Sequence, residues 1–187
     1  MANLSFMSEL TEEQRQYAEL IRSRAQEMGI SPDLAVAVAF QESRLNPSSK
    51  DSPAGAVGIM QVRPIAARDV GVDPKALRDP RQNIEAGLLY LKKALNETGD
   101  PRLATIYYNA GPQRLIEFDR GGELPKETEN YLRSLNSYGA FSPLVQPAAE
   151  VPQPAASAPE ALGAGVDFAR INAQVEESKN AQERRMA

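Results

Sequence analysis

The sequence contains no cysteine, histidine or tryptophan among its 187 residues. Without cysteine there are no disulfides and no thiol nucleophiles. Without histidine there is no Ser-His-Asp catalysis and no zinc site with the usual nitrogen and sulfur ligands. Any enzyme chemistry must therefore rest on carboxylates, hydroxyls, amides and backbone groups, and we expect neither a metal ion nor an organic cofactor. Cleavage of glycosidic bonds is a reaction class that carboxyl groups perform.

The chain also lacks strong positive charge and long apolar runs. Its net charge of −4 argues against nucleic-acid binding through phosphate neutralisation. No stretch reaches the roughly 20 apolar residues that a membrane-spanning helix needs. The first ten residues have no basic region followed by an apolar segment, so we expect no secretory signal. A soluble globular protein with one core is the class that remains.

Helix signals recur over the first 140 residues. Thr11 and Gln14 fit a capping box, and Pro80 and Pro101 each follow an aspartate that can cap a helix. We therefore predict an all-α domain over residues 1–140, with at most a small α+β element in a loop. The predicted helices are 12–28, one that ends near 43, a short one after 64, 80–96, one that ends near 110, and 126–137; residues 1–10 are interpreted as a loose lead-in and 47–61 as the loop.

Glu42 closes the most apolar of these helices. An apolar run from Leu34 to Phe40 is preceded by Ser31, a good N-cap, and followed by Pro47, which prevents continuation. A carboxyl group at the end of such a helix is poorly solvated, so its pKa should be raised, as a general acid at neutral pH requires. The alternative is that Glu42 lies on the solvated face where the helix ends.

Three further motifs follow Glu42-Ser43 in order. They are Gly58-Ile-Met-Gln61, Tyr108-Asn-Ala-Gly-Pro112, and Glu127-Thr128 with Tyr131. This series resembles the catalytic domain of the soluble-type lytic transglycosylases, relatives of goose-type lysozyme. The resemblance implies a lysozyme-like helical domain with a glycan groove. It also implies cleavage of the β-1,4 bond between N-acetylmuramic acid and N-acetylglucosamine in peptidoglycan, with a 1,6-anhydro product.

The resemblance further implies one catalytic residue and six substrate-binding residues. Glu42 would protonate the glycosidic oxygen and then act as base on the sugar's own 6-hydroxyl, which attacks C1 in place of water. Gln61, Tyr108 and Asn109 would hold the glycan, and Ser43 would orient the glutamate or the sugar. Tyr131 would restrain the cleft near Glu42, and Glu127 would bind sugar hydroxyls or anchor a helix.

Two departures from the family pattern leave alternatives open. Arg63 stands where the family often has methionine, and it could alter a subsite or contact lactyl or peptide carboxylates. Asp51 lies in the region where goose-type lysozymes carry aspartates, so hydrolysis by water is one alternative, although a solvated loop acid would look the same. A non-catalytic glycan-binding component of a virion or secretion machine is another, against which the intact Glu42 argues.

Beyond residue 140 the composition changes. Residues 141–165 are rich in proline and alanine and are predicted to form a linker, and residues 166–187 return to helix formers. Phe168, Ile171 and Val175 form a short apolar stripe that should dock on its own domain, another copy or a partner. Because we expect no export signal, we predict a bacteriophage virion-associated enzyme that acts in the host periplasm. Its terminal helix would contact virion, tail or ejection proteins.

Overall fold

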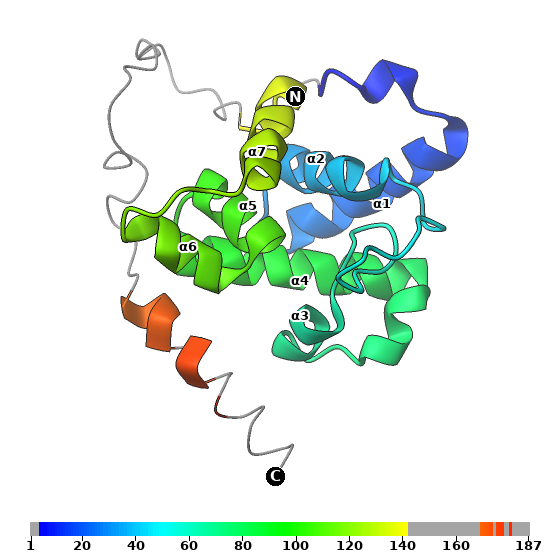
Figure 1. Ribbon diagram of the computed structural model, residues 1–187. Coiled ribbons are helices and arrows are strands. Elements are labelled where there is room, and N and C mark those ends of the chain that lie inside the picture. The colour runs from blue at the N-terminus through cyan, green and yellow to red at the C-terminus, as the bar shows by residue number, and fades with distance from the viewer. Residues whose placement is uncertain (1–3, 142–168, 174, 178–179, 181–187) are drawn as a thin grey trace.

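The computed structural model describes residues 4–141, 169–173, 175–177 and 180. Its regular structure within these residues is helical, as predicted, and α2 lies between α1 and α7 (Figure 1). The elements are η1 (Met7–Glu9), α1 (Glu12–Glu27), α2 (Pro32–Ser43), α3 (Pro64–Asp69), η2 (Pro74–Arg78), α4 (Pro80–Thr98), α5 (Pro101–Ala110), α6 (Pro112–Asp119) and α7 (Lys126–Tyr138).

The predicted capping residues begin the helices. The Thr11 side chain accepts from the backbone N–H of Gln14 while the Gln14 side chain binds the Thr11 N–H, so the capping box of α1 is complete. Asp79 and Asp100 cap α4 and α5 through their carboxylates, and each is followed by a proline at the first helical position. Short local sequence signals therefore determine where these helices begin.

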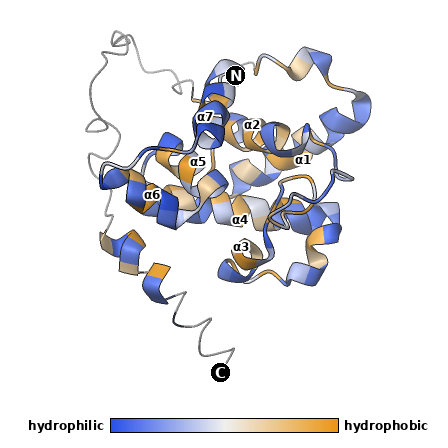
Figure 2. Cartoon of the chain, viewed as in Figure 1, coloured by the Kyte–Doolittle hydropathy of each residue, from blue (hydrophilic) through white to orange (hydrophobic). Residues whose placement is uncertain are grey.

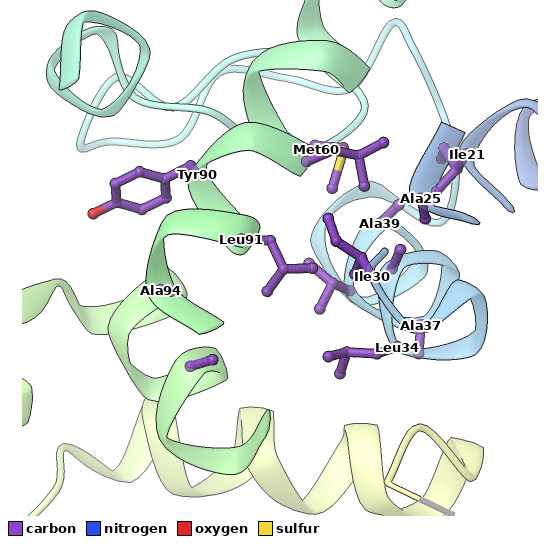
Figure 3. Packing of buried hydrophobic residues seen from close by; sticks show 14 of the residues in the cluster. Ile21, Ala25, Ile30, Leu34, Ala37, Ala39, Met60, Tyr90, Leu91 and Ala94 are labelled. Carbon is purple, nitrogen blue, oxygen red and sulfur yellow. The ribbon is translucent and has the colours of Figure 1, made fainter. Parts of the chain in front are cut away.

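Helix α2 is the centre of the core. Every residue from Leu34 to Phe40 is buried, so this helix contacts protein on all sides, whereas the outer helices carry hydrophilic residues on their exposed faces (Figure 2). Helix α1 packs on α2, and α4 packs on α5. In Figure 3, Leu91 of α4 projects toward α2, while Tyr90 projects from another side of the same helix. Helix α4 thus contributes Leu91 to the core beside α2, while Tyr90, which is also buried, lies on a different side of the helix.

Two features of the local structure differ from the prediction. The helix expected to end near residue 110 does end there, but Pro112 is also the first residue of α6, a helix that was not predicted. Gly111 has φ +86°, which lets the chain reverse between two helices, so one dipeptide both ends α5 and begins α6. The lead-in is not loose either: Leu4, Phe6 and Leu10 are buried, and the Phe6 ring stacks on that of Phe40 with centroids 3.7 Å apart.

The C-terminal segment contributes to the core in its described part. Residues 169–173 and 175–177 are helical, and Ile171 and Val175 are buried within the same hydrophobic cluster as α2. Phe168, the third residue of the predicted stripe, and nearly all of the predicted linker 141–165 lie outside the described residues. None of the helices that the structure describes is both long and apolar enough to cross a membrane.

Candidate active site

Glu42 is the penultimate residue of α2 and faces a groove. The helix ends immediately after it because Arg44 and Leu45 both adopt left-handed backbone angles, with φ of 58° and 59°. The buried part of α2 stops at Phe40, so the carboxyl group of Glu42 emerges from the core into the groove and remains partly shielded. The sequence predicted this placement, with the apolar helix ending in a carboxylate.

Burial raises the pKa of Glu42 to about 7. The loss of hydration is the largest cause, the hydrogen bond from Tyr131 opposes it, and the negative charge of Glu127 raises the pKa further. A carboxyl group with this pKa is protonated in a substantial fraction of molecules at neutral pH. Glu42 can therefore donate a proton and later accept one, which is what an acid that becomes a base must do.

Tyr131 holds the carboxyl group of Glu42. Its hydroxyl donates a hydrogen bond to Glu42 Oε1 at 2.8 Å, and its ring is buried between α7 and α2. Burial and the nearby charge of Glu42 raise the pKa of Tyr131 well above its ordinary value, so the hydroxyl keeps its proton and remains a donor. The predicted cleft-restraining role of Tyr131 corresponds to this contact.

The segment from Val57 to Val62 forms one wall of the groove. Val57 and Val62 exchange backbone hydrogen bonds, and between them Gln61 takes φ +47°, which is uncommon for a residue other than glycine. The Gln61 side-chain amide donates to the Gly58 carbonyl at 2.9 Å. Its conformation is thus tied to the tight turn, and it lines the groove beside Glu42. Backbone strain of this kind is concentrated at functional sites.

Ser43 fastens this wall to α2. Its hydroxyl donates to the Ile59 carbonyl at 2.6 Å and accepts from the Asn46 N–H at 3.1 Å. Ser43 is not among the residues that line the groove. In this structure its contacts position the Gly58–Gln61 turn relative to Glu42.

Asn83 of α4 supports the groove wall, and the sequence alone left its role unassigned. Its buried side chain accepts from the Met60 N–H at 2.8 Å and donates to the carbonyls of Val57 at 2.8 Å and Leu77 at 3.0 Å. A Cβ on Gly58 would lie 2.5 Å from its Nδ2 atom, so glycine is required for this approach. One amide therefore supports the groove wall. From the sequence, Asn83 could cap its helix or bond a neighbouring loop, and the structure shows the second.

Tyr108 and Asn109, at the end of α5, line the opposite part of the groove. The Tyr108 hydroxyl donates to the Met60 carbonyl at 2.7 Å, which joins α5 to the groove wall. Asn109 Oδ1 accepts from the hydroxyl of Thr128 at 3.0 Å, which joins α5 to α7. The Asn109 side-chain NH₂ group makes no hydrogen bond within the described residues and is available to a glycan.

The groove has a volume of about 330 Å³. It gathers residues from α2, the 52–63 segment, α3, α4, α5, α6 and α7. Five of the seven predicted site residues line the groove: Glu42, Gln61, Tyr108, Asn109 and Glu127. Of the other two, Tyr131 lies behind Glu42 and Ser43 lies behind the wall. A more open hollow of about 830 Å³ between the N-terminal segment and α1 contains none of them.

Asp51 lies outside this groove. Both of its carboxylate oxygens bind the guanidinium of Arg78, at 3.0 and 2.6 Å, in an exposed ion pair. Within the described residues, no group of three or more acidic side chains is arranged to hold a metal ion. The carboxyl groups that face the groove are those of Glu42 and Glu127.

Comparison with known proteins links this site to one family. The family described as "Transglycosylase SLT domain" matches residues 19–128. The soluble lytic murein transglycosylase of Salmonella typhimurium is 32% identical over 146 residues, covering 67% of this chain and 22% of that protein. A transglycosylase of Enterobacteria phage PRD1 is 30% identical over 137 residues, covering 73% of this chain and 49% of that protein.

A solved structure has the same fold. The X-ray structure of an inactive glutamate-to-glutamine mutant of lytic transglycosylase Slt from Pseudomonas aeruginosa superimposes with a TM-score of 0.55 and 25% sequence identity. The match covers 66% of this chain and 23% of that one. The chain thus spans half or less of the length of these relatives, and the matched part includes α2, the groove wall and α5.

Proposed function

Because the chain belongs to the SLT transglycosylase family, we propose that it is a peptidoglycan lytic transglycosylase with Glu42 as its only catalytic acid and base. The observation that carries the proposal is the pKa of Glu42, raised to about 7 in a groove of glycan-binding size. The Slt relative is described as inactive when a glutamate is replaced by glutamine, and we assign the corresponding role to Glu42.

The reaction uses the same carboxyl group twice. Protonated Glu42 gives its proton to the glycosidic oxygen as the bond from that oxygen to C1 of the N-acetylmuramic acid breaks. The Glu42 carboxylate then takes the proton of the 6-hydroxyl, whose oxygen forms a bond to C1. The products are a 1,6-anhydro sugar and a free N-acetylglucosamine hydroxyl, no water is consumed, and Glu42 is again protonated. The nucleophile belongs to the substrate and is already close to C1.

The remaining groove residues position the sugar and the acid. Tyr131 is a positioning residue, since it fixes the Glu42 carboxyl group from behind. The amides of Gln61 and Asn109 and the ring of Tyr108 supply hydrogen bonds and a stacking surface to the glycan. Ser43 acts through the wall that it fastens, and Glu127 acts through the charge that raises the pKa of Glu42.

The ion pair of Asp51 supports this route over hydrolysis. An aspartate that activates water must reach the sugar face opposite the acid, whereas both Asp51 oxygens are bound to Arg78 outside the groove. Hydrolysis as in goose-type lysozyme and glycan binding without cleavage are the competing functions. Hydrolysis would give reducing-end products in place of anhydro products. Glycan binding without cleavage would release no products.

Replacement of Glu42 by glutamine tests the proposal. Glu42→Gln preserves the shape of the side chain and removes the proton, so cleavage of purified sacculi should fall by about 10² to 10⁴-fold. Asp51→Asn is the matched control and should retain the wild-type rate. Mass spectrometry of the soluble muropeptides should show the anhydro form, which lacks one water relative to a hydrolysis product.

Other outcomes would identify the competitors. Reducing-end muropeptides together with an inactive Asp51→Asn variant would indicate a hydrolase. Tight binding of sacculi by the wild-type protein without release of soluble fragments would indicate a binding module. Cleavage by Glu42→Gln within a few-fold of wild type would remove Glu42 from the mechanism.

We further propose that the protein is carried in a phage particle and opens the host wall locally in the periplasm during infection. The similarity to the phage PRD1 transglycosylase supports this. Contact with virion, tail or ejection proteins would use the exposed side of the C-terminal segment, because Ile171 and Val175 are already buried in the core. Proteomic analysis of purified particles tests the assignment: absence of the protein from them would refute it.

A further inference from the structure

Two arginines line the groove, and they differ in their partners. The guanidinium of Arg114 binds the Glu117 carboxylate at 2.6 Å, so its charge is already matched. Arg63 is exposed to the groove and makes no side-chain hydrogen bond or ion pair within the described residues. A cation without a counter-charge inside a binding groove is a candidate for contact with an anionic part of the ligand.

The backbone of Arg63 is held firmly although its side chain is not paired. Val62, the preceding residue, exchanges backbone hydrogen bonds with Val57, and Pro64, which follows, begins α3. The Arg63 carbonyl accepts from the Ala67 N–H at 3.0 Å. The point from which the side chain departs is therefore fixed, and only its own torsions need to be ordered when it binds.

The acids that act on Tyr90 together with Arg63 have other cations beside them. Burial raises the pKa of Tyr90, the charges of Asp69 and Glu97 raise it further, and the charge of Arg63 opposes them. Glu97 is paired with Lys93 at 2.5 Å, and the cations that act on Asp69 are Lys93 and Arg68. Arg63 is thus left facing the groove beside the buried ring of Tyr90.

The position of Arg63 also preserves the catalytic acid. Burial, Tyr131 and Glu127 account for the pKa of Glu42, and Arg63 does not contribute. A cation close enough to bind Glu42 would hold its carboxyl group ionised and remove the proton that the reaction needs. Arg63 lines the same groove and makes no ion pair with Glu42 within the described residues, so its charge can serve a different part of the substrate.

We propose that Arg63 binds a carboxylate carried by the muramic acid residue of the glycan, either on its lactyl group or on its attached peptide. This inference rests on the proposed function. The sugar rings and acetamido groups of the glycan are neutral, so carboxylates on the muramic acid substituent are the anions that the groove meets. A guanidinium binds a carboxylate through two parallel hydrogen bonds, a geometry that methionine or lysine cannot reproduce.

The test compares charged and neutralised substrates. Initial rates are measured on glycan strands that carry their peptides, on strands stripped by an amidase so that the lactyl carboxylate is free, and on either kind after conversion of carboxylates to methylamides. The variants are Arg63→Met, Arg63→Lys and the matched control Arg68→Met, which removes an equally exposed arginine of α3 outside the groove.

We expect Arg63→Met to lower kcat/KM about tenfold on carboxylate-bearing strands, mainly through KM, which is the effect of one charge-assisted contact at a partly exposed site. The kcat/KM of Arg63→Lys should lie between those of Arg63→Met and wild type, and the kcat/KM of Arg68→Met should equal that of wild type. On methylamide strands all four proteins should have equal rates. A deficit found only on peptide-bearing strands identifies a peptide carboxylate. A deficit found only on stripped strands identifies the lactyl carboxylate, which is bound in an amide while the peptide is attached.

Two results overturn the inference. Equal rates of Arg63→Met and wild type on carboxylate-bearing strands, with Glu42→Gln still inactive, would remove the subsite and leave the proposed function intact. An equal deficit of Arg63→Met on methylamide strands would show that the side chain acts sterically. Failure of the wild-type protein to cleave any strand would refute the proposed function, and the subsite with it.

Discussion

Glu42 and Glu97 occupy the same place in two different helices. Each is the penultimate residue, Glu42 of α2 and Glu97 of α4, and each carboxylate faces the negative end of a helix dipole. Four residues before Glu97 stands Lys93, whose ammonium group pairs with it at 2.5 Å. Four residues before Glu42 stands Val38, which is fully buried.

The difference between the two positions lies in their neighbours. Glu97 is buried with a cation beside it, and its charge is compensated within the fold. Glu42 receives one hydrogen bond, from a neutral tyrosine, and the other charge close to it is negative. A carboxylate at the end of a helix therefore forms a structural ion pair when a lysine lies one turn earlier, as at Glu97. It can act as a proton donor when a valine lies there, as at Glu42.

The largest stability effect should come from making Glu97 resemble Glu42. Lys93→Met leaves a buried carboxylate without its cation, and we expect the free energy of unfolding at pH 7 to fall by about 3–5 kcal/mol. Urea denaturation measures this. The double variant Lys93→Met/Glu97→Gln removes both charges and should recover a large part of the loss; an equally unstable double variant would contradict the comparison.

A smaller effect of opposite sign is expected at Glu42. The pKa of Glu42 is raised from 4.5 to about 7, so between these values the folded protein binds more protons than the unfolded chain and stability falls as pH rises. Glu42→Gln does not titrate. It should be about as stable as wild type at pH 4, and more stable by up to about 3 kcal/mol at pH 8.

Thermal or urea unfolding at several pH values measures the difference. The gain should develop between pH 4.5 and 7 and then level off. Glu129→Gln, an exposed position on α7, is the matched control and should show no such trend. A gain that is the same at every pH would mean that the charge of Glu42 carries no folding cost.

The smallest effects concern the pH dependence of cleavage. Since the protonated acid begins the reaction, kcat/KM should fall as pH rises through about 7. Tyr131→Phe removes the hydrogen bond that lowers the pKa of Glu42, so the fall should move to higher pH. Glu127→Gln removes the negative charge that raises this pKa, so the fall should move to lower pH.

Each shift should amount to about one pH unit or less, because each neighbour contributes less than burial does. Initial rates on soluble glycan strands across pH 4–9 give the profiles. Shifts of the two variants in the same direction would contradict the assignment of opposite roles to Tyr131 and Glu127.

The sequence predicted those features that short local patterns encode. The caps at Thr11 and Asp79, the stop after Glu42 and the all-α class follow from rules that act over one helical turn, and the structure confirms them. The lead-in failed because the burial of Phe6 depends on Phe40, which lies far away in the chain. No local pattern records that partner.

The same limit applies within the site. The position of Glu42 in the groove was predicted because a carboxylate ends an apolar helix, whereas Asn83 was left unassigned because its three partners come from two other segments. The hydroxyl of Ser43 was expected to orient glutamate or sugar, and its bond to Ile59 appears only when the wall is folded against α2. Residues that act by supporting others need tertiary contacts to be recognised.

The hydrogen bonds of Ser43 and Asn83 act as two clamps on the chain, and they have a consequence for how such a site can diversify. Ser43 holds the chain next to α2, and Asn83 holds it again from Val57 onward. Residues 47–56 leave one clamp and return to the other, so their length and composition can change while Glu42 and Gln61 stay in register. This segment is an exchangeable insert, and grafting other loops between the two clamps would change the groove lining at Ser52 and Ala54 without moving Glu42.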